Sequence, residues 1–215
     1  MIRYKSTNPR PIAKAALSFA AGLLFAASLQ AQTPAPAGAA QRVRGTIVSV
    51  AGQDLTVKAN DGTVYPIKMA DTFRVTGVAA ATMADVTEGK YIGIASVRLP
   101  DGRMKALEVH LFDQSGARNE SQLVWDLVPD STMTNATLAQ IGQKTTDGAT
   151  MTLRVKDSTV DIVVPPNVPV AAFVPGDKSL LVAGAHVFMG VNKQADGTYT
   201  AAGANVGVNG ATPPM

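Results

Sequence analysis

The strongest structural signal in the chain is Leu55-Thr-Val-Lys-Ala-Asn-Asp-Gly-Thr-Val64, which recurs without a gap as Met151-Thr-Leu-Arg-Val-Lys-Asp-Ser-Thr-Val160, 96 residues further along. In the first copy apolar and polar side chains alternate, with Leu55, Val57 and Ala59 on one face, as in a β-strand that buries one side. Asn60-Asp61-Gly62, which follows, has the composition of a tight turn. Each copy therefore predicts a β-hairpin, and the similarity of the two copies indicates an internal repeat.

The same order of segments extends on both sides of this hairpin. Further matches are 45–50 with 136–141, 89–94 with 184–189, and the turn 101–102 with 196–197. Four matches in one order are difficult to obtain by chance. The sequence therefore predicts two homologous β modules, residues 42–114 and 135–211. A polar linker, residues 115–134, joins them. It contains Trp125, which is expected to lie where the two modules pack on each other.

Each module reads as five short strands, with hairpins joining the second strand to the third and the fourth to the fifth. In the first module a connector, 70–89, separates the third strand from the fourth. This layout is typical of the OB-fold, although an SH3-like barrel or a small sandwich would give a similar pattern. Pro66 cannot donate to a ladder, so the third strand is expected at an edge or with a bulge. The predicted fold class is all-β, with two tandem five-stranded OB-like barrels.

The N-terminal segment has the pattern of an export signal. Its basic residues are Arg3, Lys5, Arg10 and Lys14, and an apolar run follows from Ala15 to Leu29. That run is shorter than the roughly 20 residues that a membrane-spanning helix needs. Residues 1–31 are therefore predicted to be a signal peptide cleaved near Ala31, with an uncleaved anchor as the alternative. Residues 32–41, rich in Pro, Ala and Gly, are expected to be a flexible leader. The predicted location is the periplasm or the outside of a bacterial cell, with no transmembrane helix in the mature chain.

The charge of the chain belongs mostly to this signal. The 215 residues contain 19 Lys and Arg against 16 Asp and Glu, a formal net charge of +3. Four of the basic residues and none of the acidic ones precede residue 32, which leaves 15 basic and 16 acidic side chains. No basic cluster is interleaved with aromatic residues, so nucleic acid is excluded as a partner. The absence of Cys excludes disulfides, thiolate metal sites and thiol nucleophiles.

Glu108, His110 and Asp113 are the candidate metal ligands. Glu108 and His110 fall on the same face of a predicted strand, and carboxylates with an imidazole can bind a divalent cation. The alternative is that these are solvated side chains of an edge strand. The metal interpretation would make the protein a divalent-cation-binding accessory protein of a metal-handling system.

Motifs for catalysis are absent from the sequence. It contains no Gly-x-Ser-x-Gly, His-Glu-x-x-His or phosphate-binding glycine loop. The conspicuous acidic residues lie in turns, where Asp bonds to its own backbone; they are Asp61, Asp101, Asp147, Asp157 and Asp196. The sequence predicts no enzyme and no cofactor. It favours an exported binding or interaction protein whose partner is an envelope protein or a small ligand.

A family resemblance supports the same compartment. The segments that carry it are 84–94, Lys105-Ala-Leu-Glu-Val-His110, Trp125-Asp126, 131–137 and Val163-Val-Pro-Pro166. Over residues 42 to the end the chain resembles bacterial exported proteins with tandem OB-like domains of unknown function. These belong to an alphaproteobacterial group sometimes labelled a metal ABC transporter permease. The resemblance implies fold and compartment but no established activity. The permease label does not transfer, because the sequence predicts no membrane-spanning helix.

Overall fold

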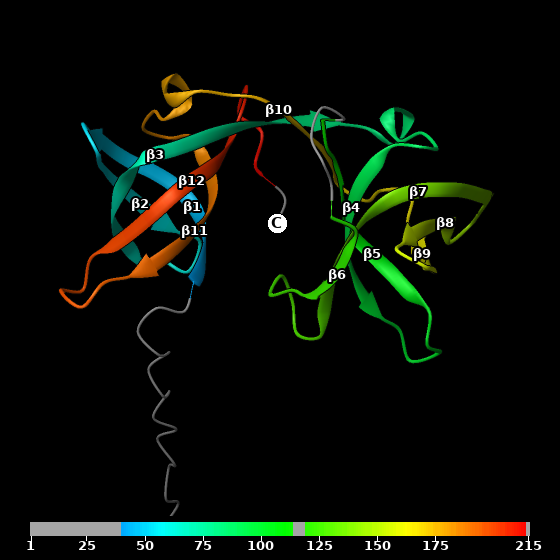
Figure 1. Cartoon of the computed structure of the whole chain (residues 1–215). Coiled ribbons are helices and arrows are strands. Elements are labelled where there is room, and N and C mark those ends of the chain that lie inside the picture. The colour runs from blue at the N-terminus through cyan, green and yellow to red at the C-terminus, as the bar shows by residue number, and fades with distance from the viewer. Residues whose placement is uncertain (1–39, 114–118, 214–215) are drawn as a thin grey trace, which may run out of the picture. The chain divides into compact units, whose positions relative to one another are not determined.

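A computed structural model describes residues 40–113 and 119–213, and the predicted signal peptide lies outside them (Figure 1). The strands are β1 (Ala40–Ala51), β2 (Asp54–Ala59), β3 (Val64–Ala81), β4 (Tyr91–Arg98), β5 (Met104–Leu111), β6 (Ser121–Val124), β7 (Ser131–Thr145), β8 (Gly148–Val155), β9 (Ser158–Val164), β10 (Val170–Pro175), β11 (His186–Lys193) and β12 (Tyr199–Gly207). Two short 3-10 turns, η1 (Met83–Asp85) and η2 (Lys178–Leu180), complete the elements. The all-β prediction is confirmed. The predicted leader is corrected at its end, because Ala40 and Gln41 already belong to β1.

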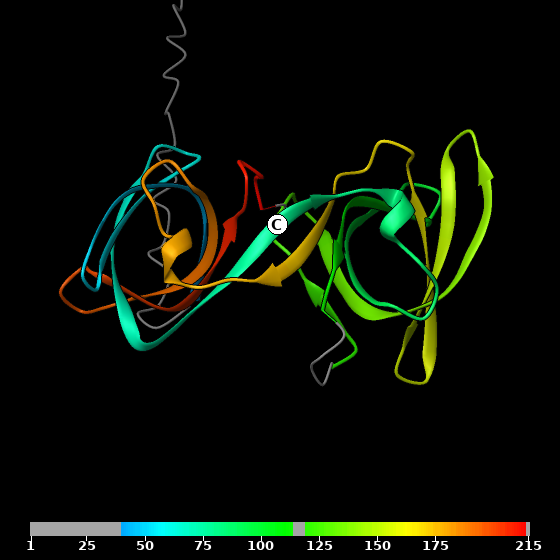
Figure 2. The same ribbon diagram turned by 90° about the horizontal axis from the view of Figure 1, so that it is seen from above.

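Five strands from the two ends of the described chain form the first barrel. Antiparallel pairing runs in the order β12-β11-β1-β2-β3, and a parallel β12–β3 pair closes the ring (Figure 2). Side chains that alternate inward fill it, including Val43, Ile47, Leu55, Val57 and Val191. Pro66 pairs with Thr56 of β2, and the pairing of β3 with β12 begins one residue later, at Ile67. Pro66 therefore has no strand on its other side that would need a backbone N–H from it.

The second barrel consists of the strands between β3 and β10. Its order is β5-β4-β7-β8-β9, and a short parallel contact, Met104 with Ile162 and Lys105 with Val163, closes the ring. Its core contains fully buried side chains, among them Ile92, Ile94, Leu138, Leu153 and Ile162.

The tandem arrangement of two barrels is not confirmed. Residues 42–114 supply β1–β3 to the first barrel but β4 and β5 to the second, while 135–211 supply β7–β9 to the second and β11–β12 to the first. The physical reason lies in β3. Residues 70–81, predicted as connector, instead prolong it to 18 residues. At about 3.3 Å per residue this strand is roughly 60 Å long, so the chain leaves the first barrel before β4 begins.

The two barrels nevertheless have the same internal register. In the hairpins β2–β3 and β8–β9, Leu55↔Ile67 of the first barrel corresponds to Met151↔Ile162 of the second. In the hairpins β11–β12 and β4–β5, Val187↔Val206 of the first barrel corresponds to Ile92↔Leu111 of the second. In the parallel pairs that close the rings, Tyr199↔Ile67 corresponds to Met104↔Ile162. Each follows the 95- or 96-residue offset of the sequence matches. β3 and β10 pair antiparallel, and Val78 meets Phe173, its own counterpart at the same offset.

Two strands lie outside the rings. β10 pairs with β3 on one side and runs parallel to β5 on the other, so it connects the two barrels by backbone hydrogen bonds. β6 pairs with β7 within the segment predicted as linker, and β7 begins at Ser131, four residues earlier than the predicted second module. Among the described residues no helix is both long and apolar enough to cross a membrane.

Candidate functional site

A cleft of about 800 Å³ lies beside β10, and we call it the β10 cleft. Strands of both barrels line it: 74–76 of β3, His110 of β5 with Phe112 and Asp113 after it, 133 and 135 of β7, 173–175 of β10, and Asn205 of β12. Trp125, which follows β6, also lines it. This volume falls in the range of sites that bind small molecules.

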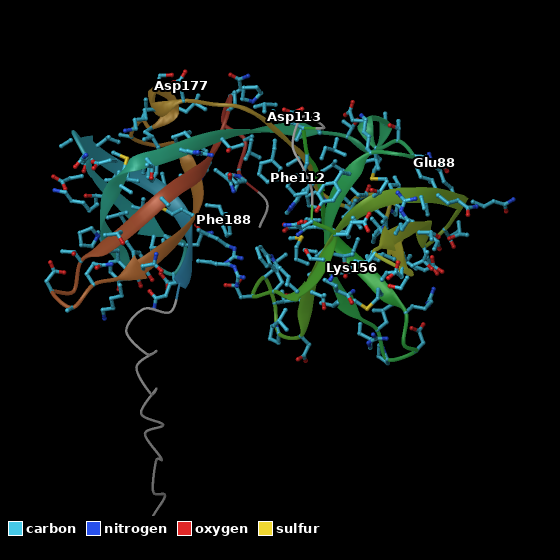
Figure 3. All side chains as sticks on the ribbon, in the orientation of Figure 1. Glu88, Phe112, Asp113, Lys156, Asp177 and Phe188 are labelled. Carbon is cyan, nitrogen blue, oxygen red and sulfur yellow. The ribbon has the colours of Figure 1, made fainter. Side chains whose placement is uncertain are left out.

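Aromatic rings form one wall of the β10 cleft. Phe112 and Phe173 stack with ring centroids 4.9 Å apart and planes 11° apart. His110 meets Phe173 edge-on at 5.9 Å, and Tyr91 packs behind Phe112 at 5.5 Å. Figure 3 labels Phe112 and Asp113 at this position after β5. Such contacts hold the rings in defined orientations, so the wall is preformed.

Several polar atoms around the cleft are buried without a partner in the described part of the chain. They are Nε1 of Trp125, Oδ1 of Asn135 and Nε2 of His110. An unpaired buried donor or acceptor costs roughly 1–3 kcal/mol, so most buried polar groups in folded proteins are paired. All three atoms belong to residues that line the β10 cleft, although the atoms themselves are buried.

Glu108 and His110 come together as predicted, but they are not solvated. They are 4% and 1% exposed, and His110 Nε2 lies 3.1 Å from Glu108 Oε1. The contact lacks the alignment of a hydrogen bond, since both atoms remain without a hydrogen-bond partner in the described residues. The edge-strand alternative is wrong, because β5 pairs with β4 on one side and with β9 and β10 on the other.

The third candidate ligand, Asp113, does not complete a metal site. It is exposed and lines the β10 cleft. Within residues 40–113 and 119–213, no group of three or more His, Cys, Asp or Glu side chains is placed to hold a metal ion. Within the described part of the chain Glu108 and His110 therefore supply at most two such ligands, fewer than a zinc site uses.

Gly93 provides the space in which Asn135 and Phe112 sit. It pairs with His110 on one side and Asn135 on the other. A Cβ at Gly93 would lie 2.7 Å from Asn135 Oδ1 and 3.0 Å from the Phe112 ring. A glycine inside a strand often marks such a close approach, but the sequence does not show that Asn135 is the residue opposite Gly93.

Trp125 and Asp126 contact β1 and β11 of the first barrel. The Arg42 guanidinium lies 4.2 Å from the centre of the Trp125 ring, and the Trp125 and Phe188 ring centroids are 6.2 Å apart. Figure 3 labels Phe188. Arg44 Nη2 donates to Asp126 Oδ1 at 2.7 Å. Burial alone would raise the pKa of Asp126, but the hydrogen bond and charge of Arg44 outweigh it and lower that pKa. We call these five residues the Trp125 latch.

The turn interpretation of the acidic residues is supported where their contacts are described. The carboxylates of Asp61, Asp101 and Asp196 each accept a hydrogen bond from the backbone N–H two residues on, at 2.9, 3.0 and 2.9 Å. These bonds, with hydroxyl and side-chain contacts to the same residues, lower the pKa of each carboxylate. The residues thus act in turn formation.

The sequence did not predict Asn135 or Phe173 as residues of a functional site. Asn135 fell just inside the predicted second module and Phe173 in the connector of that module, and both reach the cleft through pairings distant in sequence. No protein-family model matches the chain, and no curated protein or solved structure matches it either. The resemblance to exported OB-like proteins therefore stays a prediction.

Proposed function

We propose that the protein is a non-enzymatic binding protein, exported to the periplasm or beyond, that holds a small ligand in the β10 cleft. The observation that carries this proposal is a cleft of about 800 Å³ whose lining combines the stacked rings of Phe112 and Phe173 with polar side chains. A concave site with aromatic surface and a few polar groups is typical of small-molecule binding.

The chemistry of the cleft supports binding over catalysis. His110 is the one imidazole that lines it, and its nearest polar contact is the carboxylate of Glu108. A nucleophile would need to be within hydrogen-bond reach of such a base. In the described part of the chain no hydroxyl or amine is hydrogen-bonded to His110.

The proposal includes the origin of the two barrels. Residues 42–114 and 135–211 are a tandem repeat in which the last two strands of each copy complete the barrel of the other copy. The shared registers and the meeting of Val78 with Phe173 support this. Residues 1–31 are the export signal, supported by their basic start and short apolar run.

Native mass spectrometry of protein purified from the periplasm of a bacterial host tests the proposal. We expect the intact mass of a chain that begins near Gln32. We also expect a non-covalent adduct, which should be lost in Asn135→Leu. The control is Gln140→Leu, which makes the same kind of change at an exposed position of the same strand. Bare protein in every sample would contradict the binding function. A metal adduct lost on His110→Ala would instead favour the cation-binding accessory protein.

A further inference from the structure

We infer that the β10 cleft takes an aromatic carboxylate, a small ligand whose ring packs on Phe112 and Phe173 and whose carboxylate pairs with Arg74. The inference rests on the proposed function and names the chemical class of its ligand. Three features of the cleft support it: the strand register that places its residues on one face, the polar groups at one end of that face, and the aromatic rings at the other end.

Many of the residues that line the β10 cleft lie on one face of four adjacent strands, in the order β12-β3-β10-β5. Paired residues of neighbouring strands point to the same face of a sheet, and so does every second residue along a strand. Because Asn205 pairs with Thr76 and Phe173 pairs with Val78, these four residues share a face. Arg74, two residues before Thr76 on β3, belongs to it as well. We call this surface the outer face, because the alternate residues of these strands fill the barrel cores.

One end of the outer face is polar. Arg74 is exposed, Thr76 and Asn205 are half-buried, and all three line the cleft. Within residues 40–113 and 119–213 none of these three side chains takes part in a hydrogen bond or an ion pair. A guanidinium, a hydroxyl and an amide NH₂ can all donate to a carboxylate, and the guanidinium adds its charge. Because Arg74 is exposed, a carboxylate beside it keeps part of its water, which limits the cost of its desolvation.

The other end of the outer face is aromatic. Phe112 and Phe173 stack with ring centroids 4.9 Å apart, and both are half-buried, so part of their surface remains accessible. The His110 ring, edge-on to Phe173 at 5.9 Å, restricts the orientation of this pair. Contacts between aromatic rings contribute more than the burial of an equal apolar area. This end of the cleft therefore favours an aromatic ligand over an aliphatic one of similar size.

The spacing between the two ends fits a short acid. Phe173 lies opposite Val78, and Val78 is two residues from Thr76, which corresponds to about 7 Å along a strand. In 3-phenylpropionate two methylene groups separate the ring from the carboxylate, which places the charge at a comparable distance from the ring centre. A ring that packs against Phe173 thus brings the carboxylate to Thr76, from where the long side chain of Arg74 can reach it.

The acidic groups of the cleft determine which way the ligand points. Glu108 lies on β5 with its carboxylate 3.1 Å from His110, and Asp113 follows the same strand. Strand β10 separates β5 from β3, and Asp113 forms no ion pair with Arg74. A ligand carboxylate near β5 would therefore meet like charge, whereas near β3 it meets Arg74. We expect the ring toward β5 and the carboxylate toward β3.

The test is isothermal titration calorimetry of the protein purified from the periplasm, with four ligands at pH 7. 3-Phenylpropionate carries both groups, 3-phenylpropionamide removes the charge, 3-phenylpropylamine reverses it, and hexanoate removes the ring. We expect saturable binding of 3-phenylpropionate, with the other three roughly tenfold weaker or more.

Two variants separate the charge of Arg74 from the charge of the chain as a whole. Arg74→Gln should weaken 3-phenylpropionate about tenfold and leave 3-phenylpropionamide unchanged. The control is Lys68→Gln, which removes the same charge from an exposed position of the same strand outside the cleft lining. It should bind 3-phenylpropionate within about twofold of the parent chain, because exposed charges at a distance are screened. Both positions are exposed, so neither variant should change the thermal unfolding midpoint.

The outcomes separate the ligand class from the binding function. The inference is overturned if 3-phenylpropionate does not bind, if any of the other three ligands binds as tightly, or if Arg74→Gln binds it as the parent chain does. If mass spectrometry then still finds an adduct that depends on Asn135, the binding function stands and the ligand belongs to another chemical class. If neither experiment detects a ligand, both proposals fail.

Discussion

Leu55→Ala tests which strands complete the first barrel. Leu55 is 1% exposed in the core of that barrel, and its counterpart in the second barrel, Met151, is fully buried. Truncating such a side chain costs about 2–5 kcal/mol through lost burial and the cavity left behind. A loss of about 3 kcal/mol corresponds to roughly hundredfold faster exchange of amides that open with the barrel.

Hydrogen exchange followed by mass spectrometry gives the readout segment by segment. In Leu55→Ala we expect faster exchange in residues 43–57 and also in 187–206, because β11 and β12 pair within the same barrel. Residues 92–111 should keep their protection, because β4 and β5 belong to the second barrel. Met151→Ala is the matched variant and should instead accelerate 92–111 together with 149–164.

Consecutive tandem barrels would give the opposite pattern. Leu55→Ala would then expose 92–111 along with 43–57 and leave 187–206 protected. That result would refute the strand pairing and the reasoning drawn from it. Equal acceleration everywhere would refute the assignment of separate cores.

Two further variants probe the Trp125 latch and Gly93, whose neighbours Asn135 and Phe112 line the β10 cleft. Asp126→Asn should lower the free energy of unfolding by less than about 1 kcal/mol at pH 7, because the Asp126–Arg44 pair is partly exposed. Trp125 emission should shift to the red as the latch loosens. Since the pKa of Asp126 is lowered in the folded chain, this contribution is present above the ordinary value of 3.8 and is lost as the pH falls through the folded value. A pH titration of the parent chain that shows the loss above pH 5 would contradict this assignment. Gly93→Ala should lower stability by about 1–3 kcal/mol in thermal unfolding, because its Cβ would meet an atom at 2.7 Å. Gly190→Ala, with open space at its Cβ, is the control and should leave stability nearly unchanged.

Local structure was predictable because it depends on neighbours in sequence. The hairpin after Leu55 and its copy after Met151 form with the inward faces expected from alternation. The shared face of Glu108 and His110 followed from the same period of two. The sequence match between 89–94 and 184–189 also correctly paired β4 with β11, which occupy equivalent positions in the two barrels.

The exchange of strands was not predictable by these means. β4–β5 and β11–β12 carry the same sequence pattern, so this pattern does not indicate which barrel each hairpin completes. The 18-residue length of β3, which carries the chain out of the first barrel before β4, was not predicted. Alternation in 70–81 is weak, with three consecutive alanines at 79–81, so the segment read as a connector. Asn135 and Phe173 could not be placed at a site for the same reason, since their partners in the cleft depend on this exchange.

The β10 cleft depends on the strand arrangement that the sequence did not reveal. Its walls include 74–76 of β3 and 173–175 of β10, the two strands that pass between the barrels and pair with each other. The second barrel is continuous in sequence, whereas the first must join two segments separated by roughly 90 residues. Closing a loop of that length costs about 4 kcal/mol of conformational entropy. The folded second barrel reduces this cost, because it already holds Ala81 beside Val170. The second barrel can therefore persist when the first opens. Leu55→Ala, under conditions in which the first barrel opens, should then abolish ligand binding in the cleft while the second barrel, with its buried Glu108–His110 pair, stays folded.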